Sequence, residues 1–429
     1  MSDVAIDLTK TVKEIITTMK TAIDNLNTDV SSNKTAIDNL NSDVAANKTA
    51  IDNLNSDVAA KRSWEGFRNL CRAGGIRTYY GVGDQLQCKK GDTTLTWDIV
   101  HIGDVDETGG NYVILQTHDC LPMDTMEFDS REAIFRAKTT LPAGTYHFTT
   151  STSGITDPNW TDSSKSGWTK SWQFTTTKAV PAGGQINFAK GMDWNTSIAP
   201  LGIATYSTPA DTTALETVAL TEGTNGTDLA TLGTVNHAQR VCYGYNRWSQ
   251  SGLRQWLNSK AGAGAWWSPR NDFDRPEHYA TWAGFMNDLD ADFLAVIAKS
   301  NLITDINKIS DAGGHETTQD YFFLPAMVNL NGGDNFYSNP GSAVQDIEDT
   351  VVWDYYTKFR RDGKTSTNAE QDDNRRKYKQ DTSTEWSWWE RSPRCGNAGD
   401  VRNVTDGGRA WWYLDAYYWR GVAPACRIE

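Results

Sequence analysis

The first 61 residues carry a strict heptad pattern, which constrains the fold more than any other feature of the chain. The segment TAIDNLNTDVSSNK at Thr21 recurs as TAIDNLNSDVAANK at Thr35 and as TAIDNLNSDVAAK at Thr49, a period of 14 residues or two heptads. Apolar side chains that recur every ~3.5 residues form a stripe around which helices wrap left-handedly. A single helix would leave this stripe in water, so we expect residues 1–61 to form a parallel coiled-coil oligomerisation stalk.

The residues of the stripe bear on the number of chains in the stalk. Position a holds Ile or Val throughout, while position d alternates Leu with Asn. By the simple rule, a β-branched residue at a with Leu at d favours two strands. The Asn layers, however, resemble those of trimeric phage fibres and surface adhesins, and on that resemblance we expect a homotrimer. The predicted interface residues are Ile23, Leu26, Val30, Asn33, Ile37, Leu40, Val44, Asn47, Ile51, Leu54 and Val58.

The net charge and the hydropathy of the chain argue against nucleic acid and the membrane interior as binding partners. The chain has 41 Lys and Arg against 54 Asp and Glu, a formal net charge of −13, and nucleic-acid binding needs a basic face. The mean hydropathy is −0.57, and no apolar run is long enough to cross a bilayer. The first 20 residues lack the basic and apolar blocks of a secretory signal. We therefore expect no nucleic-acid binding, no membrane insertion and no signal-dependent export.

Cysteine and histidine spacing offers no metal centre. The six cysteines form no CxxC pair, and the six histidines form no HxH, HxxxH or HExxH motif. We therefore expect reduced, mostly buried thiols, no metal, no cofactor and no catalytic residues.

The rest of the chain predicts an α+β protein. Short alternating runs such as TLTWDIVHIG (94–103) and NYVILQTHD (111–119) indicate antiparallel strands. We divide this part into a first β portion (62–125), a β-rich inserted region (126–239) and a mixed C-terminal domain (240–429). Within that domain we expect helices over 249–262 and 285–300, a buried strand over 318–330 and a solvated charged stretch over 361–380.

The aromatic content is concentrated near the C-terminal end. The chain has 18 Trp, and six of the ten residues in WWYLDAYYWR (411–420) are aromatic. These residues follow neither the two-residue period of a strand nor the 3.6-residue period of a helix. One interpretation is a Trp-rich core. The other, which we favour, is an exposed recognition surface, because Tyr and Trp give large contact area with few rotatable bonds.

An ordered set of short segments resembles a known family. The segments are TYYGVGDQ (78–85), TLTWDIV (94–100), YGYNRWSQSGLRQWLNS (243–259), DYFFLPAMV (320–328), WWERSP (388–393) and GVAPACRI (421–428). Together they resemble the target proteins of diversity-generating retroelements in phages of gut bacteria. The resemblance implies a C-terminal C-type-lectin-like domain, related in fold to the formylglycine-generating enzymes. It also implies a segment, here 386–420, that a reverse transcriptase rewrites at adenines while rigid strands hold its side chains on one face.

Carried onto this chain, the resemblance predicts a variable ligand-binding face. Its members would be Trp386, Trp388, Arg394, Cys395, Asp400, Arg409, Trp411, Trp412, Tyr413, Leu414, Tyr417, Tyr418, Trp419 and Arg420. One departure concerns the three Trp residues at 411, 412 and 419. Asn codons changed only at their adenines still end in C or T, whereas Trp requires TGG. These three positions therefore arise from other template codons or are fixed.

The resemblance implies a phage-tail receptor-binding protein, located in the virion and assembled in the host cytoplasm. Its partners would be a host surface glycan or outer-membrane protein, together with other virion tail proteins. A bacterial surface adhesin with the same lectin-like head is the alternative. A formylglycine-generating-like enzyme is the third hypothesis, but fold alone does not license it, and Cys395 has no second cysteine nearby in the sequence.

Overall fold

A computed structural model of the chain divides it into two compact units, Met1–Phe67 and Arg68–Glu429. The described residues are 8–105, 109–122, 126–129, 134–151, 154–156, 170–188, 203–208, 211–219, 221–222, 230–231, 238–240, 246–266, 278–307, 313–330, 351–357, 374–380, 382–395, 399–410 and 412–429. Helices and strands both contribute substantially, which confirms the α+β class.

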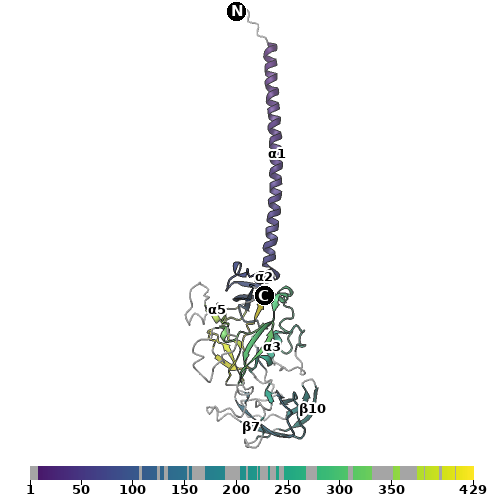
Figure 1. Ribbon diagram of the computed structural model, residues 1–429, viewed down its shortest axis with the longest axis vertical. Helices are drawn as coiled ribbons and strands as arrows, with labels where there is room; N and C mark the ends of the chain where they lie inside the picture. Colours follow the sequence, from purple (N-terminus) through teal and green to yellow (C-terminus); the bar gives the residue numbers. More distant parts are fainter. Residues whose placement is uncertain are drawn as a thin grey trace, which may run out of the picture. The chain divides into compact units, whose positions relative to one another are not determined.

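The first unit is dominated by helix α1 (Leu8–Arg62), one continuous helix in Figure 1. At ~1.5 Å per residue, its 55 residues extend about 80 Å. The repeated Thr residues fit this helix because their hydroxyls donate to the carbonyl oxygen four residues earlier, as Thr35 Oγ1 does to Ser31.

The predicted interface side chains of α1 are uncovered in the single chain. Its Ile, Leu and Val residues from Ile23 to Leu54 at these positions are between 54% and 64% exposed, and Asn33 and Asn47 are exposed as well. The side chain of Val58 lies outside the described part. Helix α2 (Trp64–Arg72) follows α1. The long helix is thus established, while its assembly into a parallel coiled coil remains a prediction.

The main sheet of the second unit joins strands that are far apart in the sequence. In order, it contains β1 (Gln85–Lys90), β2 (Thr93–Asp104), β3 (Asn111–Thr117), β21 (Ala425–Ile428) and β14 (Ile297–Ala298); β17 (Phe322–Phe323) also pairs with β21. Every pairing is antiparallel. Strand β21 lies between β3 and β14, so the last strand of the chain ties the first strands of this unit to residues near 300.

Among described residues, the strands between Ile134 and Arg240 pair only with one another. One sheet has the order β10 (Asp211–Val218), β9 (Ile203–Thr208), β8 (Gln185–Phe188), β4 (Ile134–Ala137) and β13 (Ala238–Arg240). The other has the order β11 (Thr221–Glu222), β7 (Lys170–Thr176), β5 (Gly144–Ser151) and β12 (Ala230–Thr231), with β6 (Gly154–Thr156) paired to β5.

The short helices after residue 246 have clear local causes. The turn η3 (Trp248–Gln250) leads into α3 (Gly252–Leu257), which begins where the Ser251 hydroxyl accepts a hydrogen bond from Arg254 N, as its N-cap role predicts. Helix α4 covers only Ala291–Val296: it begins where the Asp290 carboxylate caps its first turn, and it ends where Ile297 and Ala298 pair with β21 as strand β14. The helix expected over 285–300 is therefore much shorter than its apolar stripe indicated.

Five further short elements belong to the second unit. They are η1 (Ile76–Thr78), β15 (Ser300–Asp305), β16 (His315–Asp320), η4 (Val328–Leu330) and α5 (Asp354–Thr357). Strand β15 pairs with β16 in an antiparallel hairpin. The buried strand expected over 318–330 is broken into the end of β16, β17 and η4. The charged stretch expected to be solvated over 361–380 is described only from 374, where Arg375 and Lys377 are buried, so this expectation is wrong at that end.

Tryptophan builds the core of the second unit. Trp97, Trp248 and Trp256 have no exposed surface, and Trp97 contacts Phe293 and Phe322 at ring-centroid distances of 5.2 and 6.0 Å. The five cysteines in the described part are buried, as expected; Cys242 lies outside it. Large aromatic rings thus take the place that Leu and Ile occupy in ordinary cores.

Candidate functional site

The predicted variable segment forms a three-stranded antiparallel sheet. Strand β19 (Asp400–Val404) lies between β18 (Trp388–Pro393) and β20 (Trp412–Asp415). Every residue of β18 and β19 is buried, whereas β20 places Tyr413 at the surface. The segment therefore consists of a buried frame and an exposed edge.

Strand β18 is fixed to the rest of the unit by polar side chains. The guanidinium of Arg391 is buried, donating from Nε to Thr304 Oγ1 at 3.0 Å and from Nη1 to Leu324 O at 2.9 Å. The Ser392 hydroxyl accepts from Met327 N at 2.9 Å. A buried cation with matched acceptors has one favourable position, so these bonds hold the frame rigidly.

Three aromatic side chains of this segment lie at the surface. Tyr413 is 38% exposed, Tyr418 is 43% exposed and Trp419 is 45% exposed. Across the described part of the second unit, only Tyr79 and Val351 are comparable exposed large apolar side chains. A concentration of three exposed rings within seven residues is unusual for a surface without a partner.

Each exposed ring lies against another side chain that supports it. The Arg394 guanidinium carbon is 3.9 Å from the centre of the Tyr413 ring, and Arg394 is itself held by an ion pair with Asp400 at 2.8 Å. Tyr418 stacks on Tyr417 with ring centroids 5.0 Å apart. Both rings therefore pack against a neighbouring side chain while one part of each stays exposed to solvent.

Trp419 rests on a titratable pair that the sequence did not reveal. Its ring meets the His278 imidazole edge to face at 4.6 Å, and His278 Nδ1 lies 2.9 Å from the Glu127 carboxylate. Burial raises the pKa of Glu127 above its ordinary value, although bonds to the backbone and ring of His278 oppose this shift. No spacing connects residues 127, 278 and 419, so only the folded chain brings them together.

The other predicted face residues are distributed between surface and core. Arg409 is exposed; Trp386, Arg394, Leu414 and Arg420 are partly buried. Trp388, Cys395, Asp400 and Tyr417 are buried. The expectation that Trp388 lies on the exposed face is therefore wrong: its Nε1 donates to Arg375 O at 3.1 Å, and Lys377 Nζ lies 5.6 Å from the centre of its ring. Trp411 and the side chain of Trp412 lie outside the described residues.

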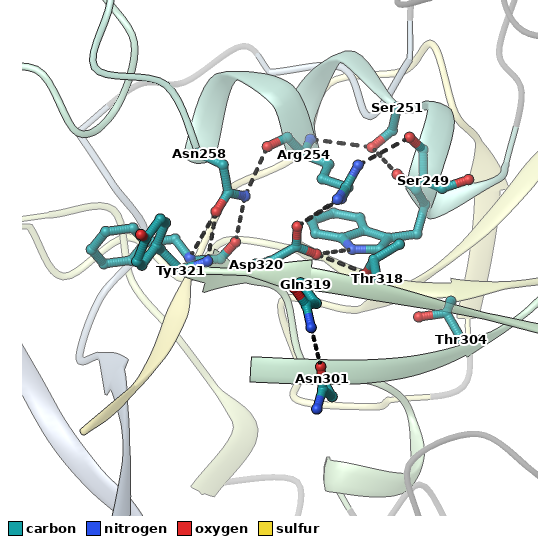
Figure 2. Close-up of polar contacts among 12 residues, drawn as sticks. Ser249, Ser251, Arg254, Asn258, Asn301, Thr304, Thr318, Gln319, Asp320 and Tyr321 are labelled. Carbon is teal, nitrogen blue, oxygen red and sulfur yellow. Dashed lines mark hydrogen bonds and ion pairs between the residues drawn. The ribbon is translucent and has the colours of Figure 1, made fainter. Parts of the chain in front are cut away.

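A second cluster of polar side chains surrounds Asp320 (Figure 2). Its carboxylate accepts from Trp248 Nε1 at 2.9 Å, from Thr318 Oγ1 at 2.8 Å and from Arg254 Nε at 2.8 Å. Asn258 bonds the backbone of Tyr321 and Phe322 beside it. Both carboxylate oxygens are already engaged and buried, so this cluster fixes α3 to the β15–β16 hairpin and offers no free base to a substrate.

Within the described ranges, no three His, Cys, Asp or Glu side chains are grouped so as to hold a metal ion. No helix among the residues that the structure describes is both long and apolar enough to cross a membrane.

Comparison with known proteins gives a single match. Residues 221–429, just under half of the chain, match a family described as a domain of unknown function (DUF6273). No curated protein and no solved structure matched the chain. The match covers the whole candidate surface but carries no functional assignment with it.

Proposed function

We propose that the protein is a receptor-binding protein of a phage tail, and that Tyr413, Tyr418 and Trp419 contact the host ligand. The observation that carries this proposal is that three exposed aromatic rings, each packed against another side chain, occur within seven residues, on the edge strand β20 and in the chain directly after it. Such rings resemble the anchors that dominate binding energy at protein and glycan interfaces.

The long helix supports the same proposal. An uncovered apolar stripe along α1 is stabilised when copies of the chain pack on one another, and a parallel trimer would present three heads on one stalk. Three linked heads convert modest single-site affinity into strong attachment. Other tail proteins of the virion are the proposed partners of the assembled trimer, and a C-type-lectin-like fold of the head remains part of the proposal.

Binding to intact gut-bacterial cells tests this function. The full chain is labelled and its binding to a panel of strains is measured by flow cytometry, with Trp419→Ala and Tyr418→Ala as the variants. Truncating one anchor costs about 2 kcal/mol, so we expect about a thirtyfold loss of single-head affinity. Tyr79→Ala is the matched control, because Tyr79 is 53% exposed and lies outside the segment.

The control variant distinguishes specific attachment through the segment from nonspecific binding by exposed aromatic side chains. Equal losses for Tyr79→Ala and Trp419→Ala would mean that the segment has no special role in attachment. Periodate or protease treatment of the cells then distinguishes a glycan from an outer-membrane protein. Substitutions concentrated at 386–420 among sibling genomes, beside a reverse-transcriptase gene and a near-copy template, are the expected genetic counterpart, and uniform drift would contradict it.

A further inference from the structure

A second cleft opens on the main sheet, and no residue of strands β18 to β20 lines it. Its volume is about 100 Å³, and residues of β2, β3, β15, β17 and β21 contribute to its walls. Cross-strand pairing sets His101, Ile114 and Arg427 in one row, because Ile114 is the register partner of both of the others. The cleft is therefore built on regular sheet and does not depend on the aromatic surface.

The charged groups of the cleft are already matched within the chain. The Arg427 guanidinium carbon lies 4.0 Å from the centre of the Tyr112 ring, and its Nε donates to Glu429 Oε2 at 2.8 Å. His101 Nδ1 lies 3.2 Å from the Asp354 carboxylate. Burial lowers the pKa of His101 despite this neighbour, which favours the neutral imidazole at pH 7. A ligand with its own net charge would find no uncompensated partner here.

The hydroxyl of Ser300 lines the cleft and has no hydrogen-bond partner among the described residues. Ser300 is only 5% exposed. A buried hydroxyl without a partner is costly, so the position favours a molecule that can accept from or donate to it. At the other side of the opening, Val351 is 41% exposed and offers apolar surface.

We propose that this cleft binds a small neutral molecule with one hydrogen-bonding group and a short apolar body, an alcohol or a carboxamide of about six non-hydrogen atoms. The polar group meets the Ser300 hydroxyl, and the apolar body lies against Val351, Leu302 and Phe323. The size follows from the cleft volume, since a cavity of ~150 Å³ holds a molecule as large as benzene. For so small a ligand in an open cleft we expect a Kd of about 1 mM.

Ligand-observed saturation-transfer NMR on the full chain tests the proposal. The probe is butyramide; butyrate is its anionic counterpart of the same shape, and butylammonium is a cationic counterpart of similar length. We expect saturation transfer to butyramide, at least a fivefold weaker signal for both charged probes, and a signal lost in Ser300→Val, which removes the hydroxyl and narrows the cleft. Ser300→Ala retains the space but not the hydroxyl, and should weaken the butyramide signal about threefold.

The control is Ser249→Ala, because the Ser249 hydroxyl is also buried without a partner but does not line the cleft. This variant should bind butyramide like the unmodified chain. Absence of butyramide binding, equal binding of the three probes, or an unchanged signal in Ser300→Val would each overturn the proposal. None of these outcomes alters cell attachment through Trp419, so the two proposals stand or fall separately.

Discussion

The strongest stability prediction concerns Asp320 and the polar cluster of Figure 2. The side chain of Asp320 is buried, and its two oxygens serve Arg254, Trp248 and Thr318. Asp320→Ala would leave the Arg254 guanidinium without its anion and the Trp248 indole without its acceptor. Removing one partner of a buried ion pair costs about 3–5 kcal/mol, so we expect a loss of that size in the free energy of unfolding.

Two neighbouring substitutions calibrate this value. Thr318→Val removes one bond to the same carboxylate and should cost about 1–2 kcal/mol. Gln319 is exposed and bonds only Asn301 at the surface, so Gln319→Ala should change stability by less than about 0.5 kcal/mol. Guanidinium unfolding followed by tryptophan fluorescence measures all three. If Asp320→Ala and Gln319→Ala unfold at the same midpoint, the reasoning that the carboxylate holds α3 to the hairpin is wrong.

Three further predictions follow from the stalk, the thiols and a glycine. Analytical ultracentrifugation of the full chain should give a mass of three times 47.7 kDa. The substitution Leu40→Asp lies in the apolar stripe and should yield monomers, whereas Ser42→Asp lies outside the stripe and should leave the trimer intact. Burial raises the pKa values of the Cys71, Cys88 and Cys120 thiols to about 12. These thiols should therefore resist alkylation at pH 8 until the protein is unfolded, and peptide mass spectrometry measures the extent of alkylation. A Cβ at Gly284 would lie 2.4 Å from Ser259 O, so Gly284→Ala should lower the melting temperature by several degrees, while Gly262→Ala, with open space around it, should not.

Periodicity predicted the parts of the fold that depend on local pattern. The heptads predicted the long helix, and the alternating runs over 94–103 and 111–119 correspond to β2 and β3. Within the helix predicted over 249–262, the structure forms η3 and α3. These features depend on residues that are close together in the chain, so a single sequence is enough to predict them.

Features that depend on contacts between residues far apart in the chain were not predicted from the sequence. Trp388 was expected on the binding face, yet its ring is buried and its Nε1 donates to Arg375 O at 3.1 Å. Arg375 lies in a stretch whose charges indicated a solvated loop, and Lys377 from the same stretch donates to His118 O at 3.1 Å. Long cationic side chains become buried when backbone carbonyls gather around them, and only the tertiary fold determines where that happens.

The side chains beneath Tyr413 and Trp419 explain why substitution of these exposed rings should leave the core intact. Tyr413 lies on Arg394, which is tied to Asp400 in the buried strand β19, and Trp419 lies on His278, which is tied to the buried Glu127. In both cases the exposed ring is separated from the core by a second residue that is itself held by a buried carboxylate. Replacing the outer ring should therefore change the proposed contact surface without opening the core. Replacing Asp400 or Glu127 instead removes the partner of that supporting residue, so we expect the proposed binding surface to tolerate change at the ring and not at the carboxylate below it.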